Sequence, residues 1–190
     1  MKINTDLKDF ILQLDNFVGK ETCDKTLQEM DKISYKQHVF YNVDDNTSAS
    51  RSGEQELEVS YDDVSTKPII MNKIWHACKA YIEYIQYPWF TGWQGYSGVR
   101  FNKYAENKKM AAHVDHIHSL FEGQRKGIPI LSVLGVLNDD YVGGEFIFFD
   151  DYKINFKQGD IVIFPSNFMY PHRVEPVKKG TRYSFISWVW

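Results

Sequence analysis

Cysteines and long apolar runs are scarce in this sequence, which limits the classes of protein that it can encode. Only two cysteines occur among 190 residues. Cys23 and Cys78 lie in predicted helices without metal-ligand spacing, which fits a reducing compartment better than a structural disulfide. The longest apolar stretch, residues 128–137, is too short to span a bilayer. The charged start, MKINTDLKDFILQLD, lacks the apolar region of a signal peptide. We therefore expect a soluble, cytoplasmic protein that does not bind membranes.

Basic charge is also not in excess. The 22 Lys and Arg residues are interspersed with 25 Asp and Glu residues, and the net charge is -3. No basic stripe indicates a nucleic-acid partner, so none is predicted. The aromatic share, in contrast, is high at 16%. Aromatic rings pack well on pleated surfaces, so this composition favours strands.

The chain shows no repeat and no low-complexity linker, which predicts a single domain over residues 1–190. Within it, residues 1–88 mix helices and strands that support residues 89–190, the expected catalytic core. Apolar spacing predicts helices over Lys20–Ile33 and Lys67–Tyr84, the second with a proline in its first turn. Strands are expected over residues 10–18 and 35–43. The polar segment from Asp44 to Gln55 is predicted to be a loop.

After Pro88 the pattern changes to short apolar segments separated by Gly- and Asp-rich turns. The predicted strands cover residues 99–104, 111–116, 130–138, 145–150, 152–156, 160–165 and 182–190. Gly143 and Gly144 are expected in a turn that needs positive φ. This rhythm predicts a mainly β fold with flanking helices (α+β), namely a double-stranded β-helix of the jelly-roll or cupin type. The two helices are expected to cover one sheet from outside.

Two histidines and one aspartate are the candidate metal ligands. His113 and Asp115 are two positions apart on a predicted strand, so both side chains should leave the same face. His172 lies between two later strands and is the candidate third ligand. Two histidines and one carboxylate occupy one face of an octahedral ion and leave other positions open. By itself, the H-x-D pair is equally explained by a buried His–Asp hydrogen bond or by an exposed turn.

Arg182 adds an anion-binding candidate to this set. It stands at the start of the last apolar strand, RYSFISWVW. A buried arginine requires an anionic partner, and its planar fork matches a carboxylate. An outward-facing arginine paired with an acidic residue is the alternative. Strand alternation places Ser184, Ile186 and Trp188 on its face, without deciding whether that face points inward.

Several motifs recur in one order along residues 99–190. They are HVD at 113–115, LND at 137–139, GGE at 143–145, QGDIVIFP at 158–165 and PHRVEPVKKGTRYSF at 171–185. In this order and spacing the chain resembles the catalytic half of prolyl 4-hydroxylases and their bacterial and phage-encoded relatives, which are Fe(II)/2-oxoglutarate-dependent oxygenases. Agreement of independent motifs is far more specific than any one of them.

The resemblance implies iron on His113, Asp115 and His172, and the distal carboxylate of 2-oxoglutarate on Arg182. Tyr104 matches a family tyrosine that also reaches this carboxylate, although a core or rim aromatic is an equal alternative. The implied reaction is hydroxylation of an unactivated C–H bond, with peptidyl proline first among substrates. It consumes O2 and 2-oxoglutarate and releases succinate and CO2, with ascorbate as reductant.

Other positions depart from the family pattern or are less specific. Val136 stands where relatives often have tyrosine, and Ser132 shares its face, so both are expected to line the co-substrate pocket. Weaker candidates for substrate contact are Arg100, Trp93, Tyr96 and His116. The loop from Asp44 to Gln55 is a candidate lid over the substrate.

Several alternatives remain open from the sequence. The substrate class covers a peptide, a protein or a small molecule, including another amino acid. A zinc hydrolase is possible because the same three ligands bind Zn²⁺. A non-catalytic jelly-roll binding protein is the other alternative. The oligomeric state is not predicted.

Overall fold

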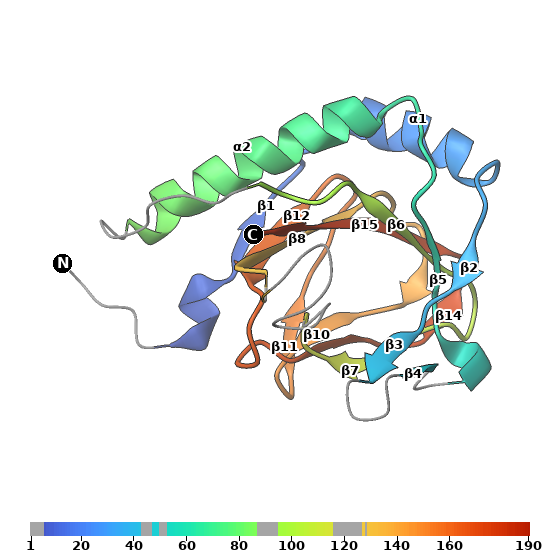
Figure 1. The fold of residues 1–190 in the computed structure, drawn as a ribbon. Coiled ribbons are helices and arrows are strands. Elements are labelled where there is room, and N and C mark those ends of the chain that lie inside the picture. Colours follow the sequence, from blue (N-terminus) through green and yellow to red (C-terminus); the bar gives the residue numbers. More distant parts are fainter. Residues whose placement is uncertain (1–5, 43–46, 50–52, 87–94, 116–126, 128) are drawn as a thin grey trace.

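The fold is seen in a computed structural model that describes residues 6–42, 47–49, 53–86, 95–115, 127 and 129–190 (Figure 1). The helices are η1 (Leu7–Phe10), α1 (Lys20–Met30), η2 (Gly53–Gln55) and α2 (Lys67–Ile85). The strands from the first half are β1 (Leu12–Leu14), β2 (Lys36–Gln37), β3 (Phe40–Asn42), β4 (Thr47–Ala49) and β5 (Glu58–Ser60). The later strands are β6 (Arg100–Tyr104), β7 (Met110–His113), β8 (Leu131–Val136), β9 (Val142–Gly143), β10 (Phe146–Phe148), β11 (Tyr152–Ile154), β12 (Ile161–Pro165), β13 (His172–Val174), β14 (Val177–Lys179) and β15 (Arg182–Val189).

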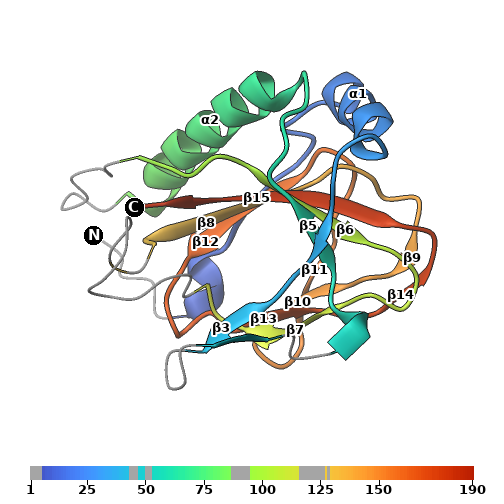
Figure 2. The ribbon, with the colours of Figure 1, turned by 45° about the vertical axis from the view of Figure 1, so that its right-hand side comes forward.

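Two antiparallel sheets face each other. The larger sheet has seven strands in the order β1-β12-β8-β15-β6-β5-β2, and the smaller has four in the order β11-β10-β13-β7. Two further pairs, β14-β9 and β3-β4, complete the described sheets. Figures 1 and 2 show the larger sheet lying between the helices and the smaller sheet. This arrangement is the double-stranded β-helix that the strand rhythm predicted.

Strand alternation divides the core into two clusters. On β8, Leu131 and Val133 pack toward the helices, whereas Leu134 and Val136 belong to the cluster between the two sheets. On β15, Phe185 belongs to the outer cluster, and Ile186 and Trp188 belong to the inner one. Because both faces of the larger sheet are covered, its central strands are apolar on both sides. The inner cluster surrounds the space in which the candidate ligands lie.

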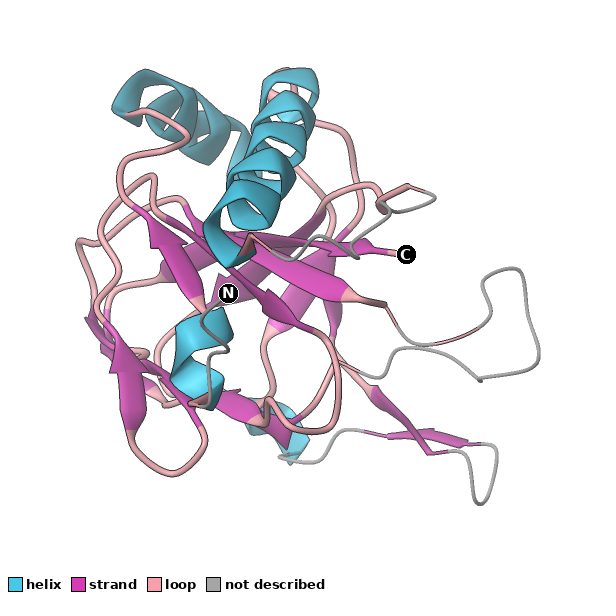
Figure 3. Ribbon diagram, turned by 90° about the vertical axis from the view of Figure 1, so that its left-hand side faces the viewer, coloured by secondary structure: helices cyan, strands magenta, loops and turns pink. Residues whose placement is uncertain are grey.

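The helices lie on the outer face of the larger sheet, as expected. Figure 3 shows α1 and α2 together on one side of the strands. Pro68 occupies the first turn of α2, where a missing backbone N–H does no harm. One face of α2 is buried, and its buried residues are Ile70, Ile74, Ala77, Cys78 and Tyr81. Both cysteines are buried and free. No described helix combines the length and the apolar character needed to cross a membrane.

Several predicted boundaries were wrong. Residues 10–18 hold only the three-residue strand β1, because η1 precedes it and a turn at Asn16 with positive φ follows it. Residues 35–43 divide into β2 and β3. Within the predicted loop 44–55, the described residues include β4 and η2. Strands β1, β5 and β2 join the larger sheet, so the first 88 residues supply part of the sheet itself.

The strand predicted over residues 111–116 also ends early. Strand β7 stops at His113, so Asp115 lies beyond it and the same-face argument for this pair was wrong. Other expectations are confirmed: Gly143 and Gly144 have φ values of 81° and 64°. Those conformations are open to glycine at little cost.

Gly135 tests the packing between the larger sheet and the helices. It lies opposite Phe185 on β15, and an added Cβ would fall within the Phe185 ring. Because overpacking forces side chains and backbone to shift, Gly135→Ala should lower the free energy of unfolding by about 1–3 kcal/mol. Urea unfolding measures this change. Gly98→Ala is the control, since no atom lies within 4 Å of a Cβ at that position. Equal stability of the two variants would contradict the packing argument.

Candidate metal centre

Three predicted ligands converge between the two sheets. His113 ends β7 and His172 opens β13, and these residues lie directly opposite each other in the strand pair. The Nε2 atoms of the two histidines lie 3.4 Å and 3.7 Å from Oδ1 of Asp115. One ligand atom from each residue lies within 4.8 Å of the others. A divalent ion fits such a set, and two histidines plus one carboxylate leave coordination positions open.

The orientation of both imidazoles suits metal binding. His113 Nδ1 lies 2.9 Å from the carbonyl oxygen of Ala111, and His172 Nδ1 lies 3.0 Å from that of Tyr170. A proton on Nδ1 donates to these carbonyls and leaves the Nε2 lone pair toward Asp115. Metal-binding histidines are commonly oriented in this way by a backbone carbonyl.

Burial controls the charge of His172. Its ring packs against Phe146, Phe148 and Phe164, with centroid distances of 5.2, 5.6 and 5.2 Å. Burial in this apolar shell, reinforced by His113, lowers the pKa of His172 to about 4, while Asp115 opposes the shift. His172 is therefore neutral at pH 7, as a metal ligand must be. For Asp115, burial raises the pKa, but His172, His113 and Ser132 outweigh it and hold the pKa well below its usual range.

Ser132, predicted to line the co-substrate pocket, contacts the candidate ligand Asp115. Its Oγ donates to Asp115 Oδ2 at 2.5 Å and lies 2.6 Å from Ser166 Oγ. Because Ser132 has one hydroxyl proton, Ser166 must donate to Ser132. The prediction for Ser132 identified its inward face but not its partner, because the position of Asp115 beyond β7 was not foreseen. No motif indicated Ser166.

Removing the Ser132 hydroxyl should weaken metal binding. Ser132→Ala leaves Asp115 with one hydrogen bond fewer and free to rotate away from the histidines. Loss of such outer contacts typically costs 10–100-fold in metal affinity, so we expect a change of about that size for Fe(II) or Mn²⁺ measured anaerobically. Ser187→Ala is a matched control because Ser187 is also buried but donates to Ser97 at 2.8 Å. Equal metal affinity in the two variants would contradict this role.

Arg182 points into the interior and is fully buried. One of its nitrogens, Nη1, donates to Ser184 Oγ at 3.1 Å, and its guanidinium lies 4.9 Å from the Tyr104 ring centre. Its Nε and Nη2 atoms are buried and have no hydrogen-bond partner in the described part of the chain. A buried guanidinium with unmet donors requires an anion. The outward alternative for this residue is therefore wrong.

Tyr104 and Val136 line the same interior. In the sheet, Tyr104 lies opposite Arg182, and Val136 lies opposite Ser184 on the other side of β15. Burial raises the pKa of the Tyr104 hydroxyl, and the charges of Arg182 and Arg100 oppose the rise. The hydroxyl lies 3.8 Å from Met110 Sδ. Both residues are thus placed where a ligand of Arg182 would meet them.

The first half of the chain also contributes to this interior, although no motif there indicated it. The Phe40 ring on β3 lies 5.4 Å from that of His113 and 4.7 Å from that of His38. His38 in turn lies 3.8 Å from a carboxylate oxygen of Glu56, which is fully buried. Only the pairing of distant strands brings these residues to the ligands.

The four weaker candidates for substrate contact differ in where the structure places them. Trp93 and His116 lie outside the described residues. Tyr96 packs with the outer cluster, and its hydroxyl lies 3.5 Å from the Met71 carbonyl of α2. Its predicted place in a substrate groove does not fit this position, because the larger sheet separates it from the ligands. Arg100 does face the interior.

A two-histidine, one-carboxylate cluster with open coordination positions is typical of non-haem Fe(II) oxygenases. Residues 99–190 match the family described as the 2OG-Fe(II) oxygenase superfamily. Through this segment, which is just under half of the chain, the protein resembles the 2OG-Fe(II) oxygenase superfamily and, within it, the prolyl hydroxylases.

Curated relatives match the same half of the chain. A PKHD-type hydroxylase of Idiomarina loihiensis is 36% identical over 94 residues, covering 48% of this chain and 41% of that protein. A PKHD-type hydroxylase of Xylella fastidiosa is 35% identical over 107 residues, covering 47% of this chain and 43% of that protein. The chain thus aligns with less than half of the length of these relatives.

Solved structures resemble nearly the whole chain in fold. The viral collagen prolyl hydroxylase of Paramecium Bursaria Chlorella virus-1, in its 2OG complex, has a TM-score of 0.66 and 15% identity, with 95% and 94% of the two chains covered. A prolyl hydroxylase of Trichoplax adhaerens, in complex with a hypoxia inducible factor peptide fragment, has a TM-score of 0.70 and 17% identity, with 96% and 84% covered. At these identities the likeness establishes the fold.

Proposed function

We propose that this protein is an Fe(II)- and 2-oxoglutarate-dependent dioxygenase. In it, His113, Asp115 and His172 hold the iron, and Arg182 holds the distal carboxylate of 2-oxoglutarate. The observation that carries this proposal is the buried Arg182 guanidinium, whose Nε and Nη2 lack partners among the described residues. A hydrolase would leave this arginine without a task, whereas a dicarboxylate co-substrate satisfies it.

Each residue has a defined role in this proposal. The Nε2 atoms of His113 and His172 and the Asp115 carboxylate would hold the metal, and a set of three protein ligands would leave it open coordination positions. Tyr104 and Val136 close the pocket around the co-substrate and exclude water from the salt bridge with Arg182, which strengthens it. When bound, iron and 2-oxoglutarate activate O2 for insertion of one oxygen atom into a substrate C–H bond, with release of succinate and CO2.

The proposed substrate is a peptidyl proline. The support is the fold likeness to prolyl hydroxylases together with the shared motif order, and fold-mates act on many substrates. A hydroxylase of another amino acid or of a small molecule is the second candidate. We further propose one catalytic domain, a cytoplasmic location and ascorbate as the reductant.

Succinate formation tests the proposed activity. Anaerobically purified protein would be supplied with Fe(II), 2-oxoglutarate, ascorbate and O2, with and without a pool of proline-rich peptides. We expect iron-dependent succinate, stimulated by the peptides, and a peptide mass increase of one oxygen atom. Succinate that small amino acids stimulate, but peptides do not, would move the proposal to the second candidate. Absence of succinate with every substrate, despite tight Fe(II) binding, would contradict the proposed function.

A further inference from the structure

A second arginine, Arg100, lies in the same interior as Arg182. It opens β6, is 7% exposed and shares the inward face of the strand with Asn102 and Tyr104. Its guanidinium carbon lies 4.9 Å from the ring centre of Trp188. Stacking on an indole stabilises a guanidinium but does not replace the hydrogen bonds that its N–H groups lose on burial.

Hydrogen bonds connect the two arginines. Arg100 Nε donates to Asn102 Oδ1 at 3.0 Å, and Asn102 Nδ2 donates to Ser184 Oγ at 3.4 Å. The same Ser184 oxygen accepts from Arg182 Nη1 at 3.1 Å. These contacts orient Arg100 but engage only its Nε. The outer Nη1 and Nη2 atoms make no hydrogen bond within the described ranges.

Acceptors for these donors are missing from the described structure. No carboxylate of a described residue lies within 4.0 Å of the Arg100 nitrogens. The buried carboxylate of Glu56 lies 3.8 Å from His38 Nδ1. The indole of Trp188, against which Arg100 stacks, carries a buried N–H without a partner in the described residues. Donors gathered around one positive charge favour an anion, and the fork of an arginine matches a carboxylate.

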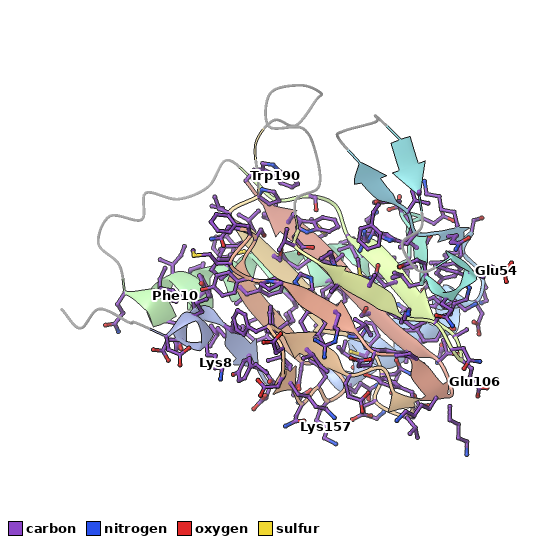
Figure 4. All side chains as sticks on the ribbon, turned by 90° about the horizontal axis from the view of Figure 1, so that it is seen from below. Lys8, Phe10, Glu54, Glu106, Lys157 and Trp190 are labelled. Atoms are coloured by element: carbon purple, nitrogen blue, oxygen red, sulfur yellow. The ribbon has the colours of Figure 1, made fainter. Side chains whose placement is uncertain are left out.

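Arg100 and Arg182 lie at different positions along the strand pair β6–β15 and face the same interior. Arg182 lies opposite Tyr104, Ser184 opposite Asn102, and Ile186 opposite Arg100. Figure 4 places Trp190, which follows β15, and Glu106, which follows β6, at opposite ends of the strands. Arg100 therefore lies toward the Trp190 end of the interior and Arg182 toward the Glu106 end.

Arg100 is also near the candidate ligands. It stacks on Trp188, and Trp188 lies opposite Ser132 in the strand pair β15–β8. Ser132 donates to Asp115 Oδ2. A carboxylate on Arg100 would therefore lie on the Asp115 side of the interior.

We propose that Arg100 and Trp188 form a second anion-binding subsite, which holds a carboxylate of the substrate beside the candidate metal centre. This inference rests on the proposed function for its assignment of the ligand as a substrate. It predicts a substrate with an acidic group near the hydroxylated carbon. The carboxylate is either a chain terminus or an acidic side chain, and the two sources share the same chemistry.

Matched acid and amide probes test the subsite by calorimetry. Acetyl-proline and acetyl-prolinamide differ in a terminal carboxylate. The amides of acetyl-prolyl-aspartate and acetyl-prolyl-asparagine differ in a side-chain carboxylate. The protein is loaded with Mn²⁺ and saturating 2-oxoglutarate, so that Arg182 is occupied without turnover. In at least one pair the acid should bind about tenfold more tightly than the amide, because charge-assisted hydrogen bonds exceed neutral ones.

Variants assign the preference to Arg100. Arg100→Met should reduce it to less than about twofold, and Arg100→Lys should retain part of it through the charge alone. Lys103→Met is the matched control, because Lys103 lies on the same strand but stacks outside on Tyr35, 5.0 Å from its ring centre. It should keep the full preference.

The outcomes separate this inference from the proposed activity. Equal binding within both pairs, or no binding of any probe, would overturn the subsite. A preference that survives Arg100→Met, or that Lys103→Met removes equally, would overturn it as well. In a second arm without 2-oxoglutarate, Arg182→Met should retain the acid preference. If the succinate assay fails while the preference still depends on Arg100, the subsite stands and the oxygenase does not.

Discussion

Alanine in place of His113 should reduce succinate formation by about 100-fold or more, equivalent to about 2.7 kcal/mol in the activation free energy. The substitution removes one of three ligand atoms that lie within 4.8 Å of one another. The two remaining ligands would hold the metal more weakly than three. Initial rates of succinate formation and the iron content after desalting are the two measurements.

His76→Ala is the matched control for this result. His76 lies on α2, where its ring contacts Trp75, and is separated from the ligands by the larger sheet. Its substitution should leave succinate formation and iron content unchanged. Full activity of His113→Ala with iron still bound would show that the cluster is not the catalytic metal site.

Methionine in place of Arg182 should raise the KM for 2-oxoglutarate by a factor of about 30 to 1000. The estimate corresponds to the roughly 2–4 kcal/mol that a buried, hydrogen-bonded charge pair loses when one partner is truncated. At saturating 2-oxoglutarate much of the rate should return, because the metal ligands remain in place. Initial rates over a wide range of 2-oxoglutarate concentrations separate KM from kcat.

Although Arg182→Met should weaken the binding of 2-oxoglutarate, it should not lower the free energy of unfolding of the metal-free protein. In the metal-free protein, Arg182 is a buried charge whose Nε and Nη2 lack partners in the described residues. Replacing it by an apolar side chain of similar length should leave the free energy of unfolding equal or higher. In the native protein, 2-oxoglutarate should raise the melting temperature, and in Arg182→Met this shift should disappear.

Arg173→Met is the control for both measurements. Arg173 is a partly exposed arginine whose Nε already donates to Glu175 at 2.6 Å. Its substitution should change neither the KM for 2-oxoglutarate nor the ligand-induced melting shift. A normal KM in Arg182→Met would show that the distal carboxylate binds elsewhere.

The candidate site was only partly predictable from sequence, and the reasons are geometric. Arg182 could be identified as an anion-binding candidate because a buried arginine in an apolar strand demands an anion, but strand alternation left its direction open. The position of Asp115 was predicted for the wrong reason, since β7 ends at His113. As a result, the hydrogen bond from Ser132 to Asp115 was missed. That contact spans two elements whose separation no local pattern encodes.

The sequence by itself determined the strand rhythm, the two helices and the candidate ligands His113, Asp115 and His172, because hydrophobic periodicity and motif spacing are local properties. Only the tertiary structure decided which way Arg182 faces. It also decided that hydrogen bonds through Asn102 and Ser184 connect Arg182 to Arg100. It also decided that strands of the first 88 residues complete the larger sheet. These facts depend on pairing between strands far apart in the chain, which is chosen by the packing of the whole core.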